Sequence, residues 1–184
     1  MALVDRVKNI LLSPKTEWPV ITGETATVQS LYVGYILILA AIGPIAMAIR
    51  GGVMGATVAL ISYGVGLAVT YLLALIVDVL APTFGAEKNF MQSLKLIAYS
   101  YTAAWVAGIF NLIPGIGGII GLIGAVYAFY TFYLGVAVMK KFPPDKAVAY
   151  TIVVVICGLL LGFALAGALM SVLGIGMMGL GMMQ

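Results

Sequence analysis

Long stretches without a charged residue dominate the chain and predict its helices. No Asp, Glu, Lys or Arg occurs at residues 25–49, 51–77, 96–139 or 147–184. A membrane-spanning helix needs about 20 mainly apolar residues, so residues 96–139 are too long for one crossing. Asn111 and the following IPGIGG break that stretch, because proline lacks an amide donor and glycine permits a tight reversal. The pattern predicts five membrane spans, near residues 28–49, 53–79, 94–113, 116–139 and 147–169.

The N-terminal residues have a different pattern. Leu3, Val7 and Ile10 follow helical spacing with Val4 and Leu11, and the polar face opposite holds Asp5, Arg6, Lys8 and Asn9. This spacing predicts a short amphipathic helix that ends before Pro14 and lies in the membrane interface. We therefore divide the chain into an interfacial segment (1–24), a membrane domain (25–170) and a Gly/Met-rich tail (171–184). The fold class expected is an all-α, five-helix transmembrane bundle.

Composition supports an integral membrane protein. Hydrophobic residues make up 64% of the 184 residues, charged residues 8%, and the mean hydropathy is +1.19. Soluble proteins carry about 25% charged residues, so the bilayer is the expected surrounding and no nucleic acid is expected as a partner. The chain has no histidine and one cysteine, and it carries none of the common catalytic, metal-binding or phosphate-binding motifs. We expect no catalytic residues, no cofactor and no metal site.

Basic residues predict the orientation. With five spans, one side of the membrane receives eight of the nine Lys and Arg residues, and the other side receives only Arg50. The positive-inside rule then places the N-terminus in the cytoplasm and the C-terminus outside. The residues expected to anchor the protein at the two membrane surfaces are Trp18, Arg50, Lys140 and Lys141.

A polar stripe and one acidic residue form the candidate functional cluster. Gln92, Lys95, Tyr99 and Thr102 share one face at the start of the third span, and Asp78 ends the second span. Because these two helices are antiparallel neighbours, Asp78 and Lys95 are expected to meet near the inner membrane boundary. Ionisable groups at membrane depth are functional candidates. The alternative is a structural pair, or charges that reach the headgroups along flexible side chains.

Glycines at four-residue spacing predict close helix packing. Small residues let helix backbones approach each other in membranes. The pairs are Gly51 and Gly55, Gly117 and Gly121, and Gly158 and Gly162. They predict either contacts inside the chain or an interface with a second subunit.

Four phrases together resemble the bacterial branch of the Yip1 family. They are LLSPKTEWPVI, LAPTFGAEKNFMQSLKLIAYSYT, NLIPGIGG and LGVAVMKKFPPDKAVAYTIVVV. The resemblance covers nearly the whole chain and implies a five-helix membrane domain with a cytoplasmic N-terminus. Eukaryotic members bind Rab-type small GTPases, which a bacterial cell would not offer, and the family supplies no catalytic residues to transfer.

Two functions remain open. The favoured one is a membrane-organising or adaptor protein that acts through helix–helix and lipid contacts, with homo-oligomers or other membrane proteins as partners. The alternative is a small transporter or channel whose polar site surrounds Asp78 and Lys95. No comparable polar residues continue outward beyond Asn111, which favours the first function.

Overall fold

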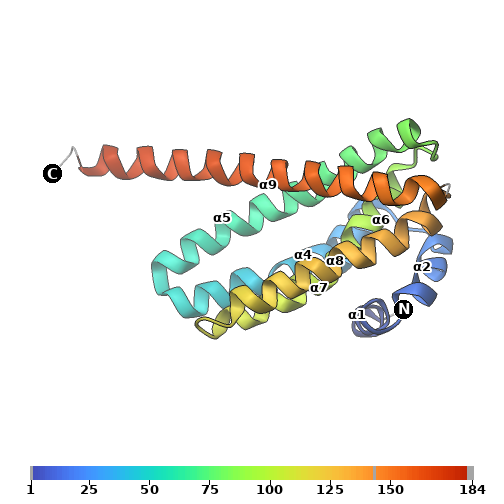
Figure 1. Cartoon of the computed structure of the whole chain (residues 1–184). Helices are drawn as coiled ribbons and strands as arrows, with labels where there is room; N and C mark the ends of the chain where they lie inside the picture. Colours follow the sequence, from blue (N-terminus) through green and yellow to red (C-terminus); the bar gives the residue numbers. More distant parts are fainter. Residues whose placement is uncertain (1, 143, 182–184) are drawn as a thin grey trace.

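The computed structural model describes residues 2–142 and 144–181, and every regular element in that part of the chain is helical (Figure 1). Helices α1 (Leu3–Leu12) and α2 (Pro14–Gly23) form an N-terminal pair, named the hairpin below, in which α1 runs across α2 and is not antiparallel to it (Figure 1). Sequence alone predicted only the first of these two helices. Pro14 occupies the first turn of α2, where its missing amide costs no hydrogen bond.

The first membrane segment is built from several short helical pieces. It consists of α3 (Val28–Leu31), the π-helix η1 (Tyr32–Ile36), α4 (Leu37–Ala40) and the first part of α5 (Ile42–Leu80). Thr27 begins it with a capping box, in which the Thr27 and Ser30 side chains each accept a hydrogen bond from the other's backbone amide.

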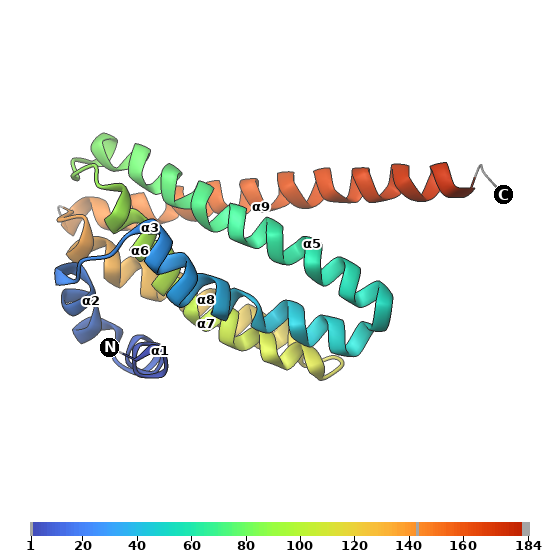
Figure 2. The same cartoon turned by 180° about the vertical axis from the view of Figure 1, so that it is seen from behind.

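Helix α5 reverses direction at Gly52. This residue has φ 58° and ψ −145°, a conformation that glycine adopts at little cost. Figures 1 and 2 show the two limbs of α5 lying side by side after the turn. The limbs approach closely there, since a Cβ atom on Gly55 would lie 2.8 Å from the Met47 carbonyl oxygen. The short 3-10 helix η2 (Ala81–Phe84) ends the second limb.

A second antiparallel pair follows. Helix α6 (Phe90–Ser100) begins at Asn89, whose side chain accepts a hydrogen bond from the Gln92 amide. It continues through α7 (Thr102–Ala107) and the 3-10 helix η3 (Gly108–Leu112), and the chain turns at Gly115, which has φ 80°. Helix α8 (Gly117–Met139) then returns along it. The predicted break at IPGIGG is therefore where the chain reverses.

Helix α9 (Pro144–Gly181) runs along α5 and α8 and projects beyond them (Figure 1). Its helical conformation reaches Gly181, whereas the sequence suggested a separate tail over residues 171–184. Residues 182–184 of that tail lie outside the described residues.

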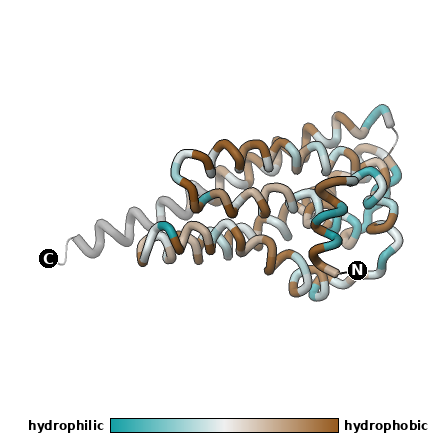
Figure 3. The backbone as a smooth tube through the Cα atoms, turned by 90° about the horizontal axis from the view of Figure 1, so that it is seen from below, coloured by the Kyte–Doolittle hydropathy of each residue, from teal (hydrophilic) through white to brown (hydrophobic). Residues whose placement is uncertain are grey.

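Three helical stretches of the described chain are long and apolar enough to cross a membrane: Val28–Phe84, Gly117–Met139 and Asp145–Leu165. The first has 57 residues and contains the Gly52 reversal. Residues 90–112 are divided among α6, α7 and η3, and none of these pieces reaches the length of a span. Figure 3 shows hydrophobic residues along most of the bundle and hydrophilic residues concentrated near the N-terminal hairpin and the turns.

The hairpin packs on one end of the bundle, mainly against α8. Trp18 is completely buried there, and its indole Nε1 donates a hydrogen bond of 3.1 Å to the Thr131 carbonyl oxygen. The Tyr127 hydroxyl donates to the Leu11 carbonyl oxygen at 2.6 Å. The prediction that Trp18 anchors at the headgroup level is wrong, because α2 turns its indole into the protein.

Candidate functional site

Two clusters of polar residues, each built around buried charged side chains, lie at the end of the bundle that carries the hairpin. We name them the Asp78 cluster (Asp78, Asn89, Ser93, Lys140) and the Arg6 cluster (Arg6, Asn9, Glu17, Glu24, Lys95). Of the described residues, the buried charged side chains all belong to these two clusters: Arg6, Glu17, Asp78, Lys95 and Lys140.

The Asp78 cluster joins three helices around one carboxylate oxygen. Asp78 Oδ1 accepts hydrogen bonds from Lys140 Nζ at 2.8 Å, from the Asn89 amide at 2.7 Å and from Ser93 Oγ at 3.0 Å. Asp78 is 4% exposed and Lys140 1% exposed. Paired and hydrogen-bonded in this way, the carboxylate avoids the large cost of a lone buried charge.

Lys140 also fixes the loop between η2 and α6. Its ammonium group donates to the carbonyl oxygens of Asn89 at 3.0 Å and Glu87 at 3.3 Å. All three donor positions of this ammonium are thereby used. The neighbouring Tyr150 hydroxyl, on α9, donates to the Val77 carbonyl oxygen. The cluster therefore ties α5, α6 and the end of α8 together, and Tyr150 adds α9 to them.

The predicted pairing of Asp78 with Lys95 is wrong. Asp78 binds Lys140, whereas Lys95 Nζ donates to the backbone carbonyl oxygens of Ile21, at 3.0 Å, and Glu24. Successive residues of a helix are about 100° apart, so Ser93 and Lys95 point to nearly opposite sides of α6. Ser93 faces Asp78, and Lys95 therefore faces the N-terminal hairpin.

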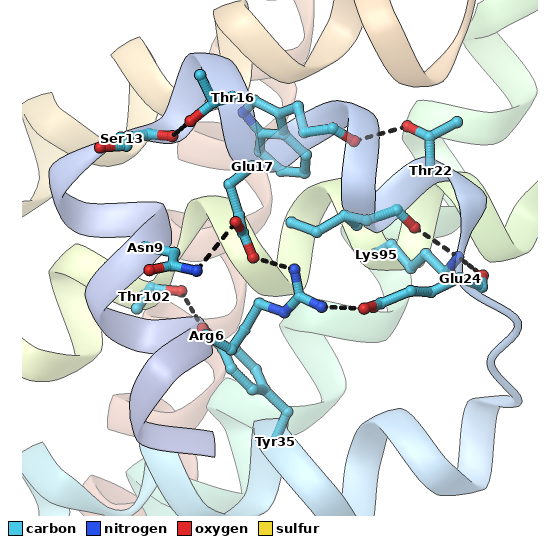
Figure 4. A network of polar contacts seen from close by, with 12 residues as sticks. Arg6, Asn9, Ser13, Thr16, Glu17, Thr22, Glu24, Tyr35, Lys95 and Thr102 are labelled. Atoms are coloured by element: carbon cyan, nitrogen blue, oxygen red, sulfur yellow. Dashed lines mark hydrogen bonds and ion pairs between the residues drawn. The ribbon is translucent and has the colours of Figure 1, made fainter. Parts of the chain in front are cut away.

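The Arg6 cluster is centred on one guanidinium group (Figure 4). Arg6 Nη1 pairs with Glu17 and Nη2 with Glu24, and Asn9 Nδ2 donates to Glu17 Oε2 at 3.2 Å. The guanidinium carbon lies 5.5 Å from the centre of the Tyr99 ring, within the range of a cation–π contact. Two cationic and two anionic side chains balance in charge within this cluster.

Arg6 was predicted on the solvent side of the first helix, and that prediction is wrong. Arg6 and Ile10 are both buried, while Val4 is 73% exposed. The inward face of α1 contains a charged residue as well as apolar ones, because α2 places Glu17 and Glu24 opposite Arg6. Neither glutamate was predicted to have a role, because their partner becomes apparent only once α2 is known to pack against α1.

The predicted polar stripe of α6 does form one face. Gln92 Nε2 donates to the Thr22 carbonyl oxygen at 3.2 Å, and the hydroxyl groups of Thr102 and Tyr35 lie 2.6 Å apart. Gln92, Lys95, Tyr99 and Thr102 therefore contact the hairpin or the first membrane segment. Asp78 is not part of this face.

The predicted surface anchors and packing glycines have mixed positions. Arg50 is exposed and donates to the Asn111 carbonyl oxygen at 3.3 Å, and the Lys141 side chain is 75% exposed near Glu87. Lys140 is buried and is not an anchor.

The predicted packing glycines divide into two groups. A Cβ atom would touch neighbours at Gly55, Gly117 and Gly158, but would meet nothing within 4 Å at Gly51, Gly121 and Gly162. Internal packing is therefore wrong for these last three. Four closely packed glycines were missed: Gly43, Gly108, Gly124 and Gly135.

The buried charged groups of both clusters have partners within the chain. Asp78 Oδ1 pairs with Lys140, Arg6 pairs with Glu17 and Glu24, and Lys95 Nζ donates to two backbone carbonyl oxygens. Among the described residues, no group of three or more His, Cys, Asp or Glu side chains is placed to hold a metal ion.

Comparison with models of known protein families shows which family this chain belongs to. The model of the Yip1 domain family matches residues 8–166, which include all of the Asp78 cluster and every member of the Arg6 cluster except Arg6 itself. The chain belongs to the Yip1 family. Membership in the Yip1 family, together with the long apolar helices, indicates a membrane protein. No curated protein and no solved structure matches the chain.

Proposed function

We propose that this Yip1-family member organises the bacterial inner membrane, or recruits other proteins to it, through lipid and helix–helix contacts, and that it performs no catalysis. The observation that carries the proposal is the internal pairing of its buried charges. A transporter that binds its ion or solute through a charged side chain would need that carboxylate or ammonium group to be free. Asp78 and Lys140 instead hold each other and the loop before α6.

The proposal includes five membrane crossings. They are the limb from α3 to Gly51, the second limb of α5, the segment from α6 to η3, α8 and α9. The reversal at Gly52 supports the first two, because a helical stretch of 57 residues is far too long for one crossing. The 23 residues from Phe90 to Leu112 are enough for the third.

The hairpin makes one end of the protein wider than the other. Helices α1 and α2 add to the bundle at one end only, as Figures 1 and 2 show. The excess of basic residues at that end supports a cytoplasmic location for it. A protein that is wider in one leaflet than in the other spreads the lipids of that leaflet, and we propose this as the means by which it organises the membrane.

Reconstitution into liposomes tests the proposal. At a fixed protein-to-lipid ratio, we expect the wild type to shift the vesicle diameters seen by electron cryomicroscopy while leaving K⁺ and H⁺ permeability at the protein-free level. Trp18→Ala removes the side chain that docks the hairpin, so it should reduce the shift in diameter. A saturable ion flux that Asp78→Asn abolishes would instead establish the transporter alternative. Unchanged diameters with the wild type would contradict membrane shaping.

A further inference from the structure

A second feature of the molecule is an apolar cavity between α5, α6, α7, α8 and α9. Its volume is about 310 Å³, the lower end of the range for small-molecule sites. Small residues on facing helices create the space, among them Ala104, Ala128 and Gly158. The cavity also borders Tyr101, Trp105, Phe129 and Phe132, and its lining contains no charged residue. It is separate from both polar clusters and has no part in the function proposed above.

Two residues that line this cavity, Tyr101 and Trp105, carry hydrogen-bond donors for which the described residues provide no acceptor. The Tyr101 and Trp105 rings meet edge to face, with centroids 5.9 Å apart. No atom of the described residues accepts a hydrogen bond from the Tyr101 hydroxyl or from Trp105 Nε1, and neither atom is sealed within packed side chains. Leaving a hydroxyl or indole N–H unpaired in an apolar environment costs free energy, so both donors favour a ligand that brings an acceptor.

The depth of these donors restricts the ligand. Tyr101 lies 11 residues beyond Phe90, which corresponds to about 16 Å along a helix. The hydrocarbon core is about 30 Å thick, so with the third crossing as proposed Tyr101 lies near its middle. Water is scarce at this depth. The ester carbonyls of glycerolipids lie near the interface, far from Tyr101.

We propose that the cavity binds a prenylated quinone, a neutral ring with carbonyl acceptors on an isoprenoid tail. The ring carbonyls accept from Tyr101 and Trp105, and the flat ring packs against Phe129 and Phe132. Phe129 and Leu159, on α8 and α9, are 37% and 50% exposed. The tail leaves between these two helices into the lipid.

Fluorescence titration tests this site. The full-length protein, in phospholipid nanodiscs, is titrated with decylubiquinone, and quenching of tryptophan emission is followed. Trp105 borders the cavity, and Trp18 is the only other tryptophan in the chain. We expect saturable quenching by the wild type. Tyr101→Phe should weaken binding about fivefold, the factor that one ordinary hydrogen bond contributes. Tyr130→Phe, which alters an exposed tyrosine outside the cavity, should bind as the wild type does.

Filling the cavity provides the second part of the test. Gly158→Leu should abolish saturable quenching, and Ala104→Leu fills the space from the opposite wall if the first variant fails to fold. Nanodisc phospholipid greatly outnumbers the quinone, so a cavity that prefers glycerolipid would give only linear, non-saturating quenching. That result overturns the proposal. Equal affinities for the wild type, Tyr101→Phe and the folded filled variant would also overturn it, since the quinone would then be merely partitioning into lipid.

Discussion

At the scale of single residues, the central feature is the Asp78 carboxylate. Three donors from different parts of the chain meet at one of its oxygens, and Lys140 supplies the only charge among them. Burying an ion pair yields little net stability, because desolvation offsets the attraction. Removing one partner is far more costly, since the other charge then stays buried alone.

A double-mutant cycle measures this coupling. Asp78→Asn and Lys140→Met should each lower the free energy of unfolding in detergent by about 3–5 kcal/mol, and the double variant should lose much less than the sum. Glu87 and Lys141 form the control pair, because they lie 3.4 Å apart with side chains 72% and 75% exposed. Their coupling should stay below about 1 kcal/mol. Additive effects for Asp78 and Lys140, within about 0.5 kcal/mol, would show that the pair does not form.

At the scale of secondary-structure elements, the N-terminal hairpin docks through a close fit. Trp18 lies over Gly135 of α8, where a Cβ atom would come within 2.6 Å of the indole and 2.5 Å of Leu96 Cδ1. The Arg6 cluster adds ion pairs between α1 and α2 and hydrogen bonds from α6. Packing positions the hairpin, and Arg6, Glu17 and Glu24 pair with one another beneath it.

A pair of glycine substitutions on α8 tests this fit. Gly135→Ala should lower the free energy of unfolding by about 1–3 kcal/mol, because the extra methyl group displaces Trp18 or Leu96. It should also speed proteolysis within residues 1–24 if the hairpin loosens. Gly121→Ala is the matched control on the same helix, since nothing lies within 4 Å of its added Cβ atom. Equal stability and equal proteolysis of the two variants would contradict the docking described here.

The contrast between predicted and observed features has a physical cause. Helix α8 covers almost the predicted range 116–139, because a charge-free run bounded by a Pro/Gly break and Lys140 leaves few alternatives. The partner of Asp78 could not be predicted in the same way. The partner depends on how far α6 and α8 are rotated about their own axes. Ser93 and Lys95 are only two positions apart on α6, yet they point to nearly opposite sides of the helix, so a small error in rotation exchanges one for the other. Helix α2 was missed because Pro19 and its few apolar residues give no clear period.

At the scale of the whole molecule, polarity is concentrated at one end. The end of the bundle that carries the hairpin holds both polar clusters and all basic residues except Arg50. Arg50 lies near the turn at the opposite end, beside Asn111. Such an arrangement suits a protein whose middle faces lipid: Leu122, Val126 and Ile152 are all more than half exposed.

Cysteine labelling tests the five crossings and their orientation. In a Cys157→Ala background, single cysteines replace Thr57, Glu87, Ile116 and Asp145, and a membrane-impermeant maleimide is applied to intact spheroplasts and to inverted vesicles. Positions 57 and 116 should react in spheroplasts, and positions 87 and 145 should react in inverted vesicles, because we propose that the side with eight of the nine basic residues is the cytoplasmic one. A reporter fused after Gln184 should be active outside the cytoplasm. If residues 28–84 formed one crossing instead of two, positions 57 and 87 would not label from opposite sides, and the hairpin could not share a side with the loop that holds Asn89.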